Sequence, residues 1–194
     1  INGNTSTKRN DSKTFSLVFK MRKIIFLFVV TFVVTSYAQE KATRNASGDL
    51  VGIVHKEDFY KQPYINWFQK NYEKYSLNKA TVKKLKKGLK NVTIKAFMGT
   101  WCRDSKREIP QFYKLLSLVK FDLKNLEMIT VNRGKRTPEN LQRGFNIIRV
   151  PTFIFYKKGK EIGRYVEYAR VSLDKDILKI LTGKKYKHSY DYTK

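Results

Sequence analysis

Cysteine is nearly absent from this sequence, which holds one such residue, Cys102, among 194. That scarcity excludes a disulfide framework, a zinc site of several cysteines and a dithiol redox pair within one chain. Histidine is also scarce: His55 and His188 lie far apart and have no neighbouring ligand pattern. We therefore expect no metal site and no cofactor. Any sulfur chemistry has to depend on a single thiol.

Acidic residues are few, with 16 Asp and Glu against 41 Lys and Arg, for a net charge of +25. A net positive charge of this size favours binding to nucleic acid, to acidic membrane surfaces or to acidic partners, and it does not distinguish among them. The densest basic patch is Lys83-Lys84-Leu85-Lys86-Lys87. A nucleic-acid surface can have this composition. We favour a solvated helix face that touches anionic envelope lipid or polysaccharide nonspecifically, and we expect no nucleic acid.

Long apolar runs are missing as well, and the strongest one, at 24–34, is too short for a bilayer that needs about 20 residues of helix. Met21-Arg22-Lys23 precedes this run and Ser36-Tyr37-Ala38 follows it. This layout is typical of a secretory signal peptide that is cleaved before Gln39. We predict a signal peptide over 21–38, untranslated upstream residues over 1–20, and an exported protein, periplasmic or secreted, without stable membrane insertion after cleavage.

The rest of the chain has enough apolar residues, 41% of the sequence, to bury a core. We divide it into an N-terminal leader and helical extension over 39–91, a main domain over 92–183 and a basic tail over 184–194. Apolar periodicity predicts helices and β-branched runs predict strands. The expected helices cover 57–75 with a break near Pro63, 79–87, 102–120 with a kink at Pro110, 138–145 and 172–181. The expected strands cover 92–98, 126–131, 152–156 and 161–166, the last two joined by a turn at Gly159.

Strands and helices in this order predict an α/β fold, with a central mixed sheet and helices on both faces. In that fold Cys102 falls at the end of a strand and the start of a helix. A thiol there faces the positive end of the helix dipole, which favours the thiolate. We expect Arg103, Lys106 and Arg107 to act in the same direction. The alternative is that Cys102 is a small apolar core residue, as free cysteines often are.

The segment Trp101-Cys102-Arg103-Asp104-Ser105 resembles the Trp-Cys-x-x-Cys motif of the thioredoxin family. Val150-Pro151-Thr152 is similar to the cis-proline turn of that family, and the hairpin 153–163 matches the strand pair that follows it. The resemblance covers about 92–181 and implies a thioredoxin-like fold. It implies that Cys102 is the catalytic nucleophile, that Trp101, Val150, Pro151 and Thr152 bind substrate, and that the partners are protein thiols and disulfides or small thiols.

Two positions depart from the family pattern. Ser105 stands where the resolving cysteine is found, so a mixed disulfide on Cys102 needs an external thiol for its release. We expect Ser105 either to hydrogen-bond the thiolate as a second catalytic residue or to be an ordinary serine of the first helical turn. Ala96 stands where the family holds a buried acid. Both departures argue against dithiol reduction.

Three functions fit these observations. The first is monothiol thiol–disulfide exchange or isomerisation through Cys102. The second is a noncatalytic thioredoxin-fold module that binds a partner through the cis-proline groove and the basic surface. The third is peroxide sensing through a sulfenic acid on Cys102.

Overall fold

The computed structural model describes residues 41–192, and the predicted signal peptide and upstream residues lie outside the described residues. A mixed sheet of six strands organises this part of the chain, in the order β1-β2-β4-β3-β5-β6. β3 and β4 are parallel, and the other neighbours are antiparallel. The strands span Thr43–Arg44 (β1), Leu50–Val54 (β2), Val92–Met98 (β3), Leu126–Thr130 (β4), Thr152–Lys157 (β5) and Lys160–Val166 (β6).

The helices lie close to the predicted bounds. They are the 3-10 turns Lys56–Tyr60 (η1) and Leu123–Asn125 (η2) and the α-helices Ile65–Lys74 (α2), Lys79–Gly88 (α3), Arg103–Leu118 (α4) and Leu173–Leu181 (α5). The predicted break near Pro63 is confirmed: the Gln62–Pro63 peptide bond is cis, and it separates η1 from α2. Within residues 41–192, no helix has both the length and the apolar composition that crossing a bilayer requires.

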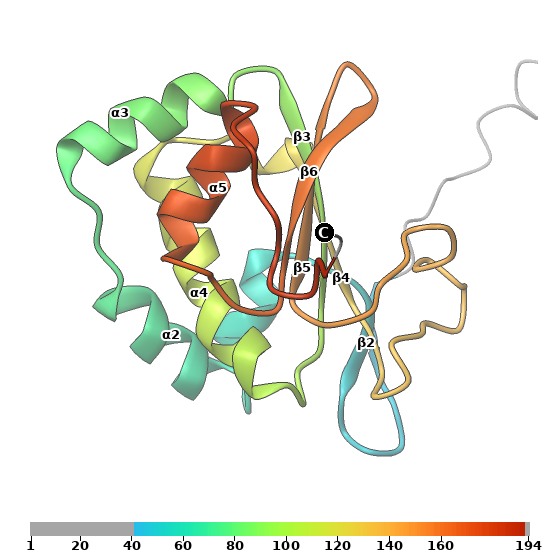
Figure 1. Cartoon of the computed structure of the whole chain (residues 1–194). Coiled ribbons are helices and arrows are strands. Elements are labelled where there is room, and N and C mark those ends of the chain that lie inside the picture. Colours follow the sequence, from blue (N-terminus) through green and yellow to red (C-terminus); the bar gives the residue numbers. More distant parts are fainter. Residues whose placement is uncertain (1–40, 193–194) are drawn as a thin grey trace, which may run out of the picture. The chain divides into compact units, whose positions relative to one another are not determined.

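The main core lies between one face of the sheet and the four α-helices, which Figure 1 shows together on one side of the strands. Alternate residues of β3 point to opposite faces, as the period of two requires. Ile94, Ala96 and Met98 join the helical core, whereas Phe97 belongs to a smaller cluster on the other face. Phe112 of α4 stacks on Phe153 of β5, with ring centroids 4.1 Å apart. This stacking fixes α4 against the sheet.

The other face is covered by the loop that joins β4 to β5, and this differs from the predicted helices on both faces. The helix expected over 138–145 is wrong, because turns occupy that segment. Asn140 has φ 57° and Gly144 has φ 83°, in the left-handed region that interrupts a right-handed helix. The side chain of Thr137 accepts from the backbone N–H of Leu141, which fixes the turn instead. The α/β thioredoxin-like fold class itself is confirmed.

The N-terminal segment 41–91 contains two strands that the sequence analysis missed, β1 and β2. β2 pairs with β4, so this segment belongs to the same sheet as the domain predicted to begin at residue 92. Gly52 in β2 has φ 118°, and a Cβ there would lie 2.9 Å from the Cα of Ala42. The close approach of β2 to Ala42 explains why glycine interrupts the apolar run of this strand. The segment predicted as a leader and helical extension therefore also contributes strands to the sheet.

Candidate active site

Cys102 occupies the junction between β3 and α4. It is the N-cap residue of α4, with φ −82° and ψ 127°, and its backbone N–H donates to the carbonyl of Gly99 over 3.0 Å. The sulfur therefore lies at the N-terminus of a 16-residue helix, where unpaired N–H groups favour negative charge. The strand-to-helix position predicted from the sequence is confirmed.

The Val150–Pro151 turn lies directly against the sulfur. Its peptide bond is cis, as the resemblance implied. Cys102 Sγ donates to the carbonyl oxygen of Val150 over 3.2 Å, and the side chain is 9% exposed. Thr152 begins β5, and its hydroxyl donates to the carbonyl of Arg149 over 2.7 Å, which closes the turn. A thiolate cannot donate to Val150, so attack on a substrate requires the sulfur to leave this contact.

Trp101 forms one wall of the site. Its indole Nε1 donates to the carbonyl of Val131 over 2.9 Å, and the Arg133 guanidinium lies 5.7 Å from the ring centroid. The ring packs on Gly99 so closely that a Cβ there would lie 2.5 Å from Trp101. Glycine is therefore required at 99 by contact with the indole.

Substitution Gly99→Ala is expected to displace the Trp101 ring, because a methyl group cannot occupy that space. Losing the half-buried hydrogen bond to the Val131 carbonyl should cost about 1 kcal/mol in addition to the strain. Unfolding in urea and the tryptophan emission of the native protein measure the two effects. Gly134→Ala is the control, since its nearest contact is 3.2 Å away on a side chain. An unchanged emission spectrum in Gly99→Ala would contradict the packing argument.

Ser105 lies beneath the loop that leads to Cys102. Its side chain is fully buried, and Oγ accepts from the backbone N–H of Gly99 over 3.2 Å. The hydroxyl therefore stabilises the turn between β3 and α4. A hydrogen bond from Ser105 to the Cys102 thiolate stays a prediction.

The basic residues of the first helical turns are distributed unevenly. Arg103 is exposed and Lys106 is half-buried. Arg107 forms ion pairs with Asp104 and Glu108, at 2.8 Å each, so two carboxylates balance its charge. Of these three residues, Arg103 and Lys106 form none of the ion pairs found among residues 41–192, so the uncompensated positive charge near Cys102 comes from them.

Glu108 is a buried acid that the sequence analysis did not single out. Its Oε2 has no hydrogen-bond partner within residues 41–192, and burial raises the pKa of Glu108 although the Arg107 guanidinium opposes the shift. The sequence did contain a signal for its burial, because Glu108 lies three residues after Ser105 and one before Ile109, on the buried face of α4. Ala96, by contrast, lies fully buried among apolar residues of the core.

Glu108→Gln is expected to make stability less dependent on pH. Because the folded pKa is raised, the favourable contribution of Glu108 is complete below its unfolded value of 4.5 and is lost as pH rises through the folded pKa. The glutamine side chain does not ionise, so the variant should gain stability relative to the native protein as the pH rises from about 4 to about 7. Urea unfolding at both pH values measures this difference. A difference that stays constant, or reverses, would contradict the burial argument.

The C-terminal tail packs beside the cis-proline turn. Ser189 donates to the carbonyl of Tyr168, Tyr190 donates to Glu167, and the Arg149 guanidinium lies 5.0 Å from the Tyr190 ring centroid. The backbone N–H of Glu167 donates to the carbonyl of Pro151 over 2.7 Å, so these contacts reach the turn that faces Cys102. Residues 184–192 of the tail form no helix or strand, as expected, but sequence analysis did not anticipate their contacts.

Neither histidine lies in a candidate metal site. His55 caps η1, and His188 Nδ1 accepts from the backbone N–H of Tyr190 over 3.1 Å. In the region from 41 to 192, no three His, Cys, Asp and Glu side chains gather in a way that could hold a metal ion.

The sheet, the cysteine at the strand-to-helix junction and the cis-proline turn define a thioredoxin-fold protein with a single thiol at its site. A family model described as thioredoxin matches residues 55–177. The chain therefore belongs to the thioredoxin family. This family has the fold of thiol oxidoreductases, and the match includes Cys102, Val150 and Pro151.

Comparison with individual proteins gives more distant similarities. A thioredoxin-like protein of Acanthamoeba polyphaga mimivirus is 30% identical over 89 residues, 46% of this chain and 62% of the relative's length. A Pseudomonas aeruginosa protein of unknown function has a similar structure, with 18% identity, a TM-score of 0.41, and coverage of 61% of this chain and 72% of that one. Fasciola hepatica thioredoxin has 19% identity and a TM-score of 0.34, with 53% and 89% covered.

Proposed function

We propose that the protein catalyses thiol–disulfide exchange or isomerisation through Cys102 alone. The observation that carries the proposal is the position of the sulfur, at the N-terminus of α4 and 3.2 Å from the Val150 carbonyl of the cis-proline turn. The helix end favours the thiolate, which is the attacking species. Protein thiols and disulfides, or small thiols, are the substrates that this chemistry requires.

The exchange proceeds in two displacements. The Cys102 thiolate attacks one sulfur of a substrate disulfide, a new S–S bond forms, and the second substrate sulfur leaves with the electron pair and takes up a proton. A second thiolate then attacks the mixed disulfide and releases Cys102 as thiolate. Ser105 cannot perform this second step, so the resolving sulfur comes from the substrate's own second cysteine or from an external thiol. No net oxidation occurs, and the balance needs no cofactor.

The cis-proline turn provides the surface for an extended substrate. Val150 presents its carbonyl next to the sulfur, Pro151 and Thr152 continue the turn, and Trp101 forms a wall of the site. In this proposal the substrate strand takes over the Val150 carbonyl as an acceptor, which frees the sulfur for attack. Substrate binding and release of the Cys102 sulfur for attack are thus coupled through the Val150 carbonyl.

We also propose that this chemistry takes place outside the cytoplasm, because the signal-peptide pattern around 21–38 supports export. Disulfide substrates are common in such oxidising compartments. Expression from Met21 in a bacterial host, followed by mass spectrometry of the exported fraction, tests this part. We expect a chain that begins at Gln39, whereas retention of the unprocessed chain in the cytoplasm would contradict export.

Reactivation of scrambled ribonuclease A in a glutathione buffer tests the enzymatic proposal. The native protein should accelerate the return of ribonuclease activity, and Cys102→Ala should reduce the rate to that of the buffer. Leu118→Ala is the matched control, since it changes an exposed residue of the same helix and keeps both the thiol and Ser105. Equal acceleration by Cys102→Ala would refute catalysis through this cysteine.

A noncatalytic binding module is the second candidate, and the burial of the sulfur favours it. The Cys102 side chain is 9% exposed and its thiol donates to Val150, as an inert core thiol would. Such a module would bind its partner through the cis-proline groove and the basic surface. Capture of the same partner by native protein and Cys102→Ala, in the absence of ribonuclease reactivation, would support this function.

A further inference from the structure

A hollow lined by lysines lies at the other end of β3 from Cys102. It has a volume of about 670 Å³ and is bounded by the end of α3, the start of β3 and the end of α4. We call it the lysine hollow; its basic residues are Lys83, Lys86, Lys87, Lys90 and Lys120. β3 has seven residues, at about 3.3 Å each, so the hollow is separate from the thiol site.

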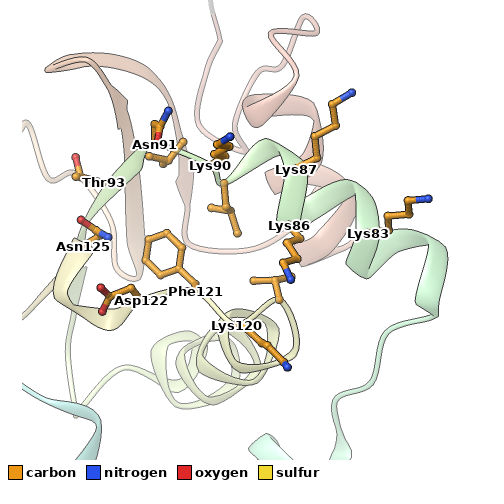
Figure 2. Close-up of a pocket in the computed structure, with 13 residues that line it drawn as sticks. Lys83, Lys86, Lys87, Lys90, Asn91, Thr93, Lys120, Phe121, Asp122 and Asn125 are labelled. Carbon is orange, nitrogen blue, oxygen red and sulfur yellow. The ribbon is translucent and has the colours of Figure 1, made fainter.

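Two helix ends build the lysine hollow. α3 ends at Gly88 and α4 ends at Leu118. After each helix the backbone changes direction at a residue in the left-handed region, Asn91 (φ 58°) after α3 and Lys120 (φ 56°) after α4. The reversal after α4 is fixed by a bond of 2.9 Å from the N–H of Phe121 to the carbonyl of Leu116. Figure 2 shows Lys86 extending from α3 toward the end of α4, and the Phe121 ring beside Asp122 on the other side of the hollow.

The floor of the lysine hollow is apolar and the rim is cationic. Leu89, Val92 and Val119 are buried parts of the core, and Phe121 is half-buried above them. All five lysines are exposed. The floor is therefore part of the packed core, whereas the lysines lie at a solvent-exposed rim.

The charges on the rim do not compensate one another. Asp122 is the one carboxylate lining the hollow, and its Oδ1 accepts from the backbone N–H of Lys124. Among residues 41–192, none of the five lysines takes part in an ion pair at 4.0 Å or less. The carbonyl ends of α3 and α4 each supply only about half a negative charge. A surplus of about three positive charges thus remains in one cavity.

This surplus costs stability. Lys83 and Lys87 are four residues apart on α3, and such a like-charge pair destabilises a helix by about 0.2–0.5 kcal/mol. Lys90 follows the end of α3 and adds a further positive charge to the same rim. The partial negative charges at the C-terminal ends of α3 and α4 could be balanced by fewer than five lysines, so helix stabilisation alone does not account for this cluster. An external anion that fits the cavity would remove the repulsion.

We propose that the lysine hollow binds a phosphate-bearing anion of small-molecule size. Its volume is within the range of about 300–1,000 Å³ that is usual for small-ligand sites. Lysine ammonium groups are suited to phosphate as point charges, and the floor with Phe121 accepts the carbon part of a phosphate ester. Two sources share this chemistry, a soluble polyphosphate or phosphate ester and the phosphate headgroup of a lipid.

Isothermal titration of the whole protein with sodium tripolyphosphate, and flotation with phosphatidylglycerol vesicles against phosphatidylcholine vesicles, tests the proposal. The variant Lys86→Gln/Lys90→Gln removes two charges from the rim. The matched control Lys157→Gln/Lys160→Gln removes two exposed lysines from the β5–β6 hairpin. Circular dichroism and alkylation of Cys102 verify that both variants keep the native fold.

We expect the rim variant to lose at least about tenfold in affinity, since two phosphate contacts are removed, while the control stays within about twofold. Binding of tripolyphosphate identifies a soluble source, and binding of phosphatidylglycerol vesicles alone identifies a lipid headgroup. Equal losses in both variants would mean attraction to net charge only and would overturn the proposal. Absence of binding to either probe would overturn it too, whatever the outcome at Cys102.

Discussion

Ser105→Cys is expected to shorten the lifetime of a mixed disulfide on Cys102 by at least about tenfold at low external thiol, because an intramolecular thiol has an effective concentration in the millimolar range. Residue 105 is three positions after the N-cap Cys102, in the first turn of α4. A cysteine there can attack the mixed disulfide and close an internal one. The native protein lacks that reaction, because its only cysteine is Cys102.

Oxidised glutathione provides the measurement. The glutathione adduct is formed on each protein and its decay is followed by mass spectrometry after acid quenching. Ser105→Ala is the matched control, since it removes the bond to the Gly99 N–H without adding a thiol, and its adduct should last as long as the native one. An adduct of equal lifetime in Ser105→Cys would show that a sulfur at 105 stays buried against Gly99, out of reach of Cys102.

Phe112→Ala is expected to lower the free energy of unfolding by about 3–5 kcal/mol, the usual cost of emptying a buried phenylalanine site. The ring is fully buried and stacks on Phe153, with an interplanar angle of 11°. This contact fixes α4 on β5, and therefore also holds the N-cap Cys102 beside Val150. Urea unfolding monitored by circular dichroism measures the loss.

Leu118→Ala is the control for that substitution, because this residue belongs to the same helix and is 36% exposed. A surface change of this kind should stay within about 0.5 kcal/mol. A loss below about 1 kcal/mol in Phe112→Ala would contradict the account of how α4 is held.

The elements that carry the site could be predicted from the sequence because local and tertiary preferences agree there. Val92–Met98 and Arg103–Leu118 lie close to the predicted bounds, since β-branched residues and an amphipathic face favour the same structures that the core needs. Lys158 and Gly159 form the predicted hairpin turn with φ 51° and 74°. The cis bond at Pro151 came from the resemblance to the family and not from periodicity.

The missed features depend on long-range contacts. β2 becomes a strand by pairing with β4, which is far away in the sequence. Residues 138–145 have helical spacing, but left-handed residues and the Thr137 side chain select turns. The burial of Glu108 was indicated by its helical spacing, whereas the tail contacts of Tyr190 join residues from separate segments. No local pattern encodes these pairings.

The rate at which iodoacetamide alkylates Cys102 at pH 7, in the native protein and in the urea-unfolded chain, tests the central claim most directly. All modification is at one sulfur, because the chain has one cysteine. If the N-terminus of α4 activates this thiol, the native protein reacts at least about tenfold faster than the unfolded chain despite its burial. A native rate below the unfolded rate would mark Cys102 as an inert core thiol and contradict the proposed exchange activity.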